Sequence, residues 1–179
     1  MLLASSSKDG YIRLWRITPD KDALKFHKNV HTLLENYHVF LESVLISHEC
    51  SVTSLEWTRF GGKLQLVSCS LDSTLCIWEH QENAWTVESR LGQFIGNKNA
   101  YFDAKADSQF QHLIALNYTG AVLIWKWSPE KFALRESFNG HASEVNGIEW
   151  NHTGDFLVSV SKDQTTRVIA KNNKTQQFN

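Results

Sequence analysis

The chain has 179 residues, and its content of 42% hydrophobic and 12% aromatic residues is enough to form a buried core and is unlike that of a disordered segment. Its 18 Lys and Arg residues against 19 Asp and Glu residues give a formal net charge of -1, so no bulk positive field favours direct nucleic-acid binding. The longest apolar runs have about five residues, whereas a membrane-spanning helix needs about 20, so no membrane span is expected.

The amino terminus and the cysteines indicate the compartment. The first ten residues, MLLASSSKDG, have neither the basic start nor the apolar stretch of a secretory signal. Cys50, Cys69 and Cys76 form no even disulfide framework and no CxxC pair, which suits a reducing environment. We therefore expect an intracellular protein, located in the cytoplasm with the nucleus as a second location.

Four similar units follow one another along the chain. Each unit is a turn residue followed by an alternating strand, at Asp9 to Trp15, Asp72 to Trp78, Thr119 to Trp125 and Asp163 to Ile169. A second short strand precedes each turn, with the sequences LLASSS, LQLVSCS, HLIALN and FLVSVS. The pattern predicts four β-hairpins, each with a polar two-residue corner.

A further strand precedes two of the hairpins at matched offsets. It has the sequence HECSVTSLEW from His48 and HASEVNGIEW from His141. The turn positions 72, 119 and 163 are spaced close to the ~40 to 45 residues of a WD40 β-propeller blade. The histidine, turn aspartate and strand tryptophan of the unit that ends at Trp78 resemble those of WD40 repeats.

The resemblance to WD40 repeats implies a structural hydrogen-bond network in each blade. In the second unit it would run from Trp78 through Ser68 or Ser70 to His48 and Asp72. Such a chain satisfies buried polar groups and fixes the hairpin against the first strand.

The other units depart from this pattern. The fourth unit has His141, Ser159 or Ser161, and Asp163, but Ile169 replaces the tryptophan, so its network is expected to be partial. The third unit has Asn117 and Thr119 and no matching histidine, so packing is expected to hold its strands together.

The predicted fold is therefore all-β: an incomplete WD40 β-propeller of about three and a half blades of four-stranded antiparallel sheets. The expected units are a partial blade at 1–46 that lacks its first strand, a blade at 47–98, a degenerate blade at 99–139, an incomplete blade at 140–170 and a polar tail at 171–179. A seven-bladed ring needs about 280 residues, so we expect the blades to belong to a longer protein. A polar insertion at about 18–37 is either a solvated loop or a partner-docking loop.

Several stretches resemble one WD40 family in particular, the WD40 subunit of the Elongator complex. They are, in order, LLASSSKDGYIRLWRI, ESVLISHECSVTSLEW, AWTVESRLGQFIGNKNAYFDAK, GAVLIWKW and SKDQTTRV. The resemblance implies a non-catalytic scaffold that binds a large platform subunit and a catalytic subunit of a complex that modifies the wobble uridine of tRNA. The acetyl-CoA and iron–sulfur chemistry would belong to that catalytic partner, so no cofactor is expected here. A generic WD40 adaptor, such as a ubiquitin-ligase substrate receptor or a chromatin reader, is the alternative.

Two arrangements have residue types that occur in enzyme or metal sites. His27 and His31 are four residues apart, as zinc ligands on a helix would be, but no third ligand stands nearby. His48 and Cys50 place a base beside a thiol, but a catalytic dyad requires side chains that converge across the fold. We expect no catalytic, cofactor-binding or metal-binding residues, and the sequence does not locate the partner-binding surface.

Overall fold

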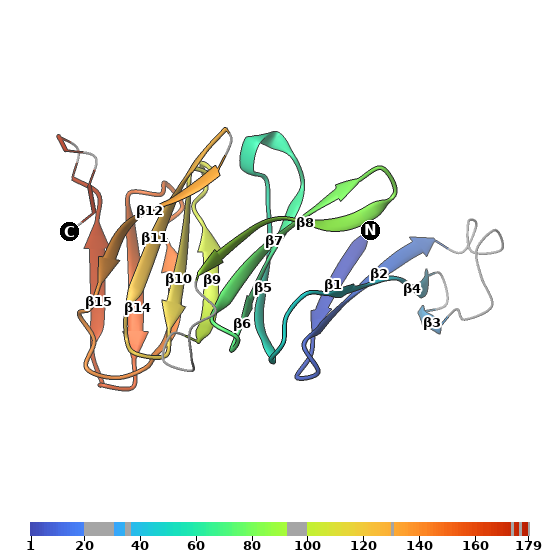
Figure 1. The fold of residues 1–179 in the computed structure, drawn as a ribbon, viewed down its shortest axis with the longest axis horizontal. Coiled ribbons are helices and arrows are strands. Elements are labelled where there is room, and N and C mark those ends of the chain that lie inside the picture. Colours follow the sequence, from blue (N-terminus) through green and yellow to red (C-terminus); the bar gives the residue numbers. More distant parts are fainter. Residues whose placement is uncertain are drawn as a thin grey trace.

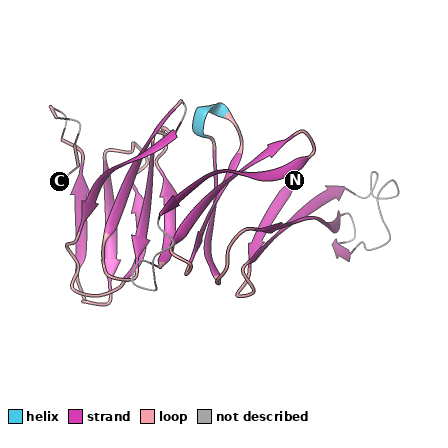
Figure 2. Cartoon of the chain, in the orientation of Figure 1, coloured by secondary structure: helices cyan, strands magenta, loops and turns pink. Residues whose placement is uncertain are grey.

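The computed structural model describes residues 1–19, 31–34, 37–92, 100–129, 131–172, 174–175 and 177–178. Within these ranges the protein consists of β-strands and one short 3-10 turn, Phe60–Gly62 (Figure 2). The strands are β1 (Leu2–Ser6), β2 (Tyr11–Pro19), β3 (His31–Leu34), β4 (Tyr37–Ile46), β5 (Val52–Thr58), β6 (Gln65–Ser70), β7 (Thr74–Gln81), β8 (Ala84–Gly92), β9 (Tyr101–Ala106), β10 (His112–Asn117), β11 (Val122–Ser128), β12 (Lys131–Phe138), β13 (Val145–Trp150), β14 (Phe156–Ser161) and β15 (Thr166–Ala170). No helix in this part of the chain is long and apolar enough to cross a bilayer.

The strands form four antiparallel sheets that stand side by side in a row (Figure 1). The first sheet has the order β1-β2-β4-β3, the second β5-β6-β7-β8, the third β9-β10-β11-β12 and the fourth β13-β14-β15. The described residues therefore give three four-stranded sheets and one three-stranded sheet. This arrangement confirms the predicted all-β fold of about three and a half propeller blades.

Each repeated hairpin turns through a residue in the left-handed backbone region. Gly10 has φ 83°, Ser73 φ 70°, Gly120 φ 89° and Gln164 φ 66°. The connections run over three or four residues, so the predicted two-residue corners were wrong. The additional residues fit because the turn aspartate or asparagine accepts backbone N–H groups, as Asp72 does from Thr74 at 2.9 Å.

The glycine at one of these turns is required by a close contact as well as by its backbone angle. A Cβ atom on Gly120 would lie 2.8 Å from the carbonyl oxygen of His141, in the loop before β13. The turn of the third sheet therefore packs directly on the loop that leads into the fourth sheet.

The hydrophobic core lies between neighbouring sheets. In the second sheet Cys76 and Trp78 face the first sheet, whereas Leu75 and Ile77, which alternate with them along β7, face the third sheet. Because β7 is covered on both faces, its first six residues are all buried. A third cluster, which includes Ile124 and Leu157, fills the space between the third and fourth sheets.

Parts of the expected insertion and of the expected polar tail have a defined structure. Residues 20–30 and 35–36 of the insertion at about 18–37 lie outside the described residues, but β3 pairs with β4 at the outer edge of the first sheet. In the tail, Phe178 is 6% exposed and forms a β-bridge with Lys171. Its ring lies 5.5 Å from that of Trp150, so the tail returns to the apolar space between the third and fourth sheets.

Candidate functional site

The second sheet contains a continuous hydrogen-bond chain across three of its segments. His48, in the loop before β5, hydrogen-bonds through Nδ1 to Asp72 Oδ2 at 2.9 Å and through Nε2 to Ser68 Oγ at 2.7 Å. The indole Nε1 of Trp78 donates to the same Ser68 oxygen at 2.8 Å. Because the His48 and Asp72 side chains are 0% and 2% exposed, these bonds replace water for groups deep in the sheet.

The structure assigns different roles to Ser68 and Ser70, which sequence reasoning left as alternatives. Ser68 joins His48 to Trp78. Ser70 instead donates to the carbonyl oxygen of Cys50 at 3.2 Å and accepts the N–H of Asp72 at 3.1 Å. Its role is to bind the turn and the preceding loop.

The His48–Asp72 pair has opposite pKa shifts on its two members. Burial lowers the pKa of His48, but the hydrogen bond to Asp72 and the nearby Cys76 outweigh it and raise that pKa to about 9. Burial likewise raises the pKa of Asp72, but hydrogen bonds from His48 and Thr74 lower it to about 2. The favoured state is an ion pair whose charges hold the hairpin against the first strand.

The fourth sheet has the same polar arrangement without the tryptophan. His141 hydrogen-bonds to Asp163 Oδ2 at 3.1 Å and to Ser159 Oγ at 2.9 Å. Ser161 takes the place of Ser70, donating to the carbonyl oxygen of Glu144 at 2.8 Å. The pKa of Asp163 lies below its ordinary value, mainly because its carboxylate accepts a hydrogen bond from the Thr165 side chain.

The third sheet has polar contacts at two of its connections, and sequence reasoning missed the second. At the first, the predicted turn, the Asn117 side chain accepts the backbone N–H groups of Thr119 and Ala121. At the connection between β9 and β10, Asp107 Oδ2 hydrogen-bonds to His112 Nδ1 at 2.8 Å, with both side chains buried. The described residues of the other units have no aspartate–histidine pair at this connection, so the period offered no signal for it.

The first sheet retains half of the network. Trp15 Nε1 donates to Ser5 Oγ at 2.9 Å, as Trp78 does to Ser68. The two residues occupy the repeat positions of Trp78 and Ser68, so alignment of the units was a sufficient signal. The turn residue Asp9 forms an ion pair with Arg13 at 2.8 Å.

Polar side chains also join the innermost strands of neighbouring sheets. Ser54 donates to Asp103 at 2.6 Å, and Lys105 forms an ion pair with Glu56 at 3.1 Å, both between β5 and β9. Each pair is 49 positions apart, close to the spacing of the repeat. Sequence reasoning missed these contacts, although the period places such residues on adjacent strands. They set the spacing of the second and third sheets.

The candidate catalytic and metal residues do not form a reactive site. Both ring nitrogens of His48 are bonded to Asp72 and Ser68, which leaves neither for the thiol of Cys50. Among the described residues no group of three His, Cys, Asp or Glu side chains is placed to hold a metal ion. His27 lies outside these residues, as does the side chain of His31.

A groove of about 550 Å³ crosses the turn ends of the first three sheets, and we call it the turn-side groove. It is lined by Lys8, Cys50, Ser51, Leu71, Ala100 and Tyr118. Backbone hydrogen bonds hold the lining loops of each sheet together: in the second sheet the N–H of Leu71 donates to Ser51 at 3.1 Å, and in the third sheet that of Tyr118 donates to Ala100 at 2.8 Å. Tyr118 is 47% exposed, so the groove offers an aromatic side chain on a hydrogen-bonded turn.

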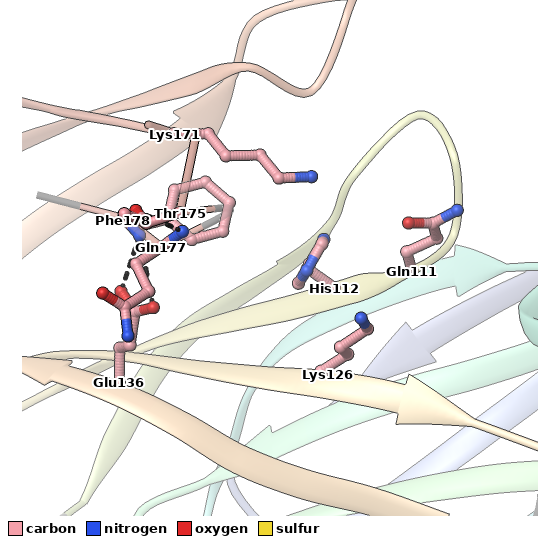
Figure 3. Close-up of a pocket in the computed structure, with 8 residues that line it drawn as sticks. All are labelled: Gln111, His112, Lys126, Glu136, Lys171, Thr175, Gln177 and Phe178. Atoms are coloured by element: carbon pink, nitrogen blue, oxygen red, sulfur yellow. Dashed lines mark hydrogen bonds between the residues drawn. The ribbon is translucent and has the colours of Figure 1, made fainter. Parts of the chain in front are cut away.

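A second pocket, of about 290 Å³, lies where the tail meets the third sheet (Figure 3). A carboxylate that lines it, that of Glu136, accepts the backbone N–H of Phe178 at 2.9 Å. Figure 3 shows Lys171 and Lys126 on either side of His112, whose Nδ1 is bonded to Asp107. The carboxylate of Glu136 therefore holds the tail, and the imidazole of His112 stabilises the connection between β9 and β10.

Comparison with known proteins identifies the repeat. The family model described as "WD domain, G-beta repeat" matches residues 40–79 and 132–169. The chain is also similar to the C-terminal WD40 domain of Sif2, with a TM-score of 0.68, 21% identity, and coverage of 96% of this chain and 43% of that chain. At this identity the likeness concerns the fold alone.

The curated relatives carry one name. Elongator complex protein 2 of Drosophila melanogaster is 33% identical over 95% of this chain and 25% of its own length. The protein of that name from Homo sapiens is 30% identical over 95% of this chain and 24% of its length, and that from Mus musculus 31% over 99% and 24%. The chain thus spans about a quarter of the length of these relatives.

Proposed function

We propose that the chain, two stretches of which match the WD40 repeat model, acts as a non-catalytic scaffold in the Elongator complex. There it would support modification of the wobble uridine of tRNA through protein–protein contacts. The observation that carries the proposal is the similarity to Elongator complex protein 2 over 95% of this chain in Drosophila and human. The expected partners are the large platform subunit and the catalytic subunit, in the cytoplasm and also in the nucleus.

The use of the polar residues supports a scaffold. The histidines of the second and fourth sheets bond to an aspartate and a serine within their own sheet. The hydrogen bonds of these residues stabilise the sheets themselves, as expected for a platform that binds other proteins.

The turn-side groove is the part of the scaffold that we propose for partner contact. Loops from three sheets line it, and Leu71 and Tyr118 give it apolar and aromatic surface beside the charge of Lys8. Exposed aromatic and apolar side chains on a rigid base are typical of protein-binding surfaces. The small net charge of the chain gives no comparable support for direct tRNA contact.

The test is affinity purification of the endogenously tagged gene product, followed by identification of the stoichiometric partners. Recovery of a very large platform subunit and a radical-enzyme subunit is expected. Recovery of ubiquitin-ligase or chromatin components in their place would establish the generic adaptor and contradict the proposal.

A matched pair of variants tests the groove within the same purification. The double variant Leu71→Glu and Tyr118→Ala is expected to lose at least one Elongator partner. Leu134→Glu, at a residue 55% exposed on β12 and outside the groove, is expected to retain both. Equal recovery with both variants would remove the groove from the proposal while leaving the scaffold role in place.

A further inference from the structure

The first three sheets each have a charged side chain directly after the repeat tryptophan. These side chains are Arg16, Glu79 and Lys126. Strand pairing confirms that the positions are equivalent, because each partner on the preceding strand directly precedes the leucine that pairs with the tryptophan. The partners are Leu2, Gln65 and His112.

In the first two sheets this charge is compensated within the sheet. Arg16 donates to Glu42 Oε1 at 2.8 Å, and Glu42 lies on β4 of the same sheet. Glu79 forms an ion pair with Lys63 at 2.7 Å and accepts the side-chain amide of Gln65 at 3.1 Å. At both positions a side chain of the protein therefore supplies the opposite charge.

In the third sheet the equivalent Lys126 has no such contact. It lines the pocket of about 290 Å³ where the tail meets the sheet, together with Lys171. Among the described residues neither lysine forms an ion pair. Glu136 also lines the pocket, but its carboxylate is bonded to the N–H of Phe178, and Figure 3 shows it on the tail side, across from Gln111. The two amino groups therefore bring positive charge to the pocket with no carboxylate bound to either.

The imidazole of His112 adds a nitrogen between the two lysines. Its side chain is 7% exposed, and Nδ1 is bonded to Asp107 Oδ2 at 2.8 Å. Nε2 has no hydrogen-bond partner among the described residues, and Figure 3 shows the ring between the amino groups of Lys171 and Lys126. Because Asp107 fixes the ring, Nε2 is held in place for a group bound in the pocket.

We propose that this pocket binds a phosphoryl group, either inorganic phosphate or a phosphomonoester. The ligand supplies the opposite charge that Glu42 and Lys63 supply in the first two sheets. The ammonium groups of Lys126 and Lys171 bind it as point charges, and Nε2 of His112 hydrogen-bonds to one of its oxygens. The inference does not rest on the proposed function.

Charge and size favour a phosphoryl group over a carboxylate. A phosphomonoester carries a charge of about −1.5 to −2 at pH 7 and three acceptor oxygens, which matches two ammonium groups and further donors. The side chains of Gln111 and Thr175 line the same pocket and can donate to the remaining oxygens. The volume lies below the range of clefts for drug-sized ligands, about 300–1,000 Å³, so the pocket suits a small group.

The first measurement is a binding titration with the full-length gene product that contains this chain, purified through an affinity tag and labelled with a fluorophore. Inorganic phosphate and N-acetyl-phosphoserine amide are the probes, and acetate at matched ionic strength is the control. Saturable binding of at least one probe is expected, about 10-fold tighter than that of acetate. Tighter binding of inorganic phosphate would identify the free ion as the ligand, and tighter binding of the capped phosphoserine a phosphorylated side chain. No saturable binding of either probe, or equal binding of acetate, would overturn the proposal.

Removal of either amino group tests which residues hold the ligand. Lys126→Gln and Lys171→Gln each remove one charge-assisted hydrogen bond, so each should raise the dissociation constant of the tighter probe by about 10-fold or more. Lys131→Gln removes the same charge from an exposed lysine on β12 that does not line the pocket, and no change is expected. Equal effects of all three variants would show a general effect of charge and contradict the proposal.

A further substitution gives the third sheet the charge that the second sheet has. Lys126→Glu introduces a carboxylate into the pocket that Lys171 lines, as Glu79 meets Lys63 in the second sheet. Binding of the probe is expected to be lost, while the midpoint of thermal unfolding without phosphate stays the same or rises. Added phosphate should raise the midpoint of the unsubstituted protein only, because a ligand that binds the folded state stabilises it. An equal rise in both proteins would place phosphate binding elsewhere and overturn the proposal.

Discussion

The second and fourth sheets contain the same histidine, serine and aspartate arrangement but differ in what surrounds it. In the second sheet Trp78 extends the chain through Ser68, and the side chains of His48 and Asp72 are 0% and 2% exposed. In the fourth sheet Ile169 stands where the tryptophan would be, and Asp163 is 9% exposed. The polar motif forms with or without the tryptophan; the histidine is buried in both sheets, and the aspartate is more exposed in the fourth.

The difference indicates that the same motif can contribute differently to the free energy of unfolding in different sheets. A hydrogen bond in a covered site contributes more because its partners cannot turn to water when it breaks. Among the described residues the second sheet packs against a neighbouring sheet on both faces, whereas the fourth packs against one on a single face. Equivalent substitutions in the two sheets should therefore have unequal effects.

Removal of the tryptophan should have the largest effect. Trp78→Ala opens a cavity between the first and second sheets and is expected to lower the free energy of unfolding by about 3–5 kcal/mol. Ile169→Ala, at the equivalent position, should cost less because less volume is removed. Urea unfolding followed by circular dichroism measures both. Trp78→Phe separates the lost N–H donor from the lost volume, and equal losses for the two alanine variants would contradict the comparison.

Removal of the turn aspartate should come next. Asp72→Ala leaves His48 and the backbone N–H groups of Glu49 and Thr74 without their acceptor, at a cost of about 3 kcal/mol. The matched Asp163→Ala is expected to lose less, because the Asp163 side chain is 9% exposed and that of Asp72 is 2% exposed. The same urea titration measures both variants. A larger loss of unfolding free energy in Asp163→Ala would show that coverage of the sheet does not determine how much the network stabilises it.

The pH dependence should give the smallest of the three effects. Because the pKa of His48 is raised to about 9, its contribution is complete below its ordinary pKa of 6.5 and is lost as the pH rises through about 9. The contribution of Asp72 is complete above its ordinary pKa of 3.8 and is lost as the pH falls through about 2. Between pH 6.5 and 9 the free energy of unfolding should fall by about 2 kcal/mol.

Variants assign that decline to one histidine. His48→Gln should flatten the profile between pH 6.5 and 9, whereas His141→Gln should retain the decline that His48 contributes. Urea titrations at each pH, with a reductant present for the free cysteines, give the profile. A decline of unchanged size in His48→Gln would assign it to another group.

Repeat spacing was sufficient to predict the hairpins and their order. The interval between matched turns indicated which strands pair, and the resemblance to WD40 repeats implied that His48, Asp72 and Trp78 meet through one of two serines. These contacts follow from local pairing and alternation along strands, which are properties of a short stretch of sequence. The similarity to Elongator complex protein 2 was also evident at this level.

Other contacts depended on how the sheets stand relative to one another. The pairing of Ser54 with Asp103 crosses between sheets, and the choice between Ser68 and Ser70 was decided by which hydroxyl faces the histidine. Asp107 and His112 meet because a strand connection turns back on itself. None of these distances follows from the spacing of a single repeat.

The sequence by itself thus determined a repeated β-hairpin architecture, because strand alternation and turn chemistry are local. Only the tertiary structure decided which faces of those hairpins are covered, since equivalent residues such as Ile77 and Val168 differ from fully buried to 61% exposed. Burial is a property of neighbouring sheets, and it sets the strength of each network.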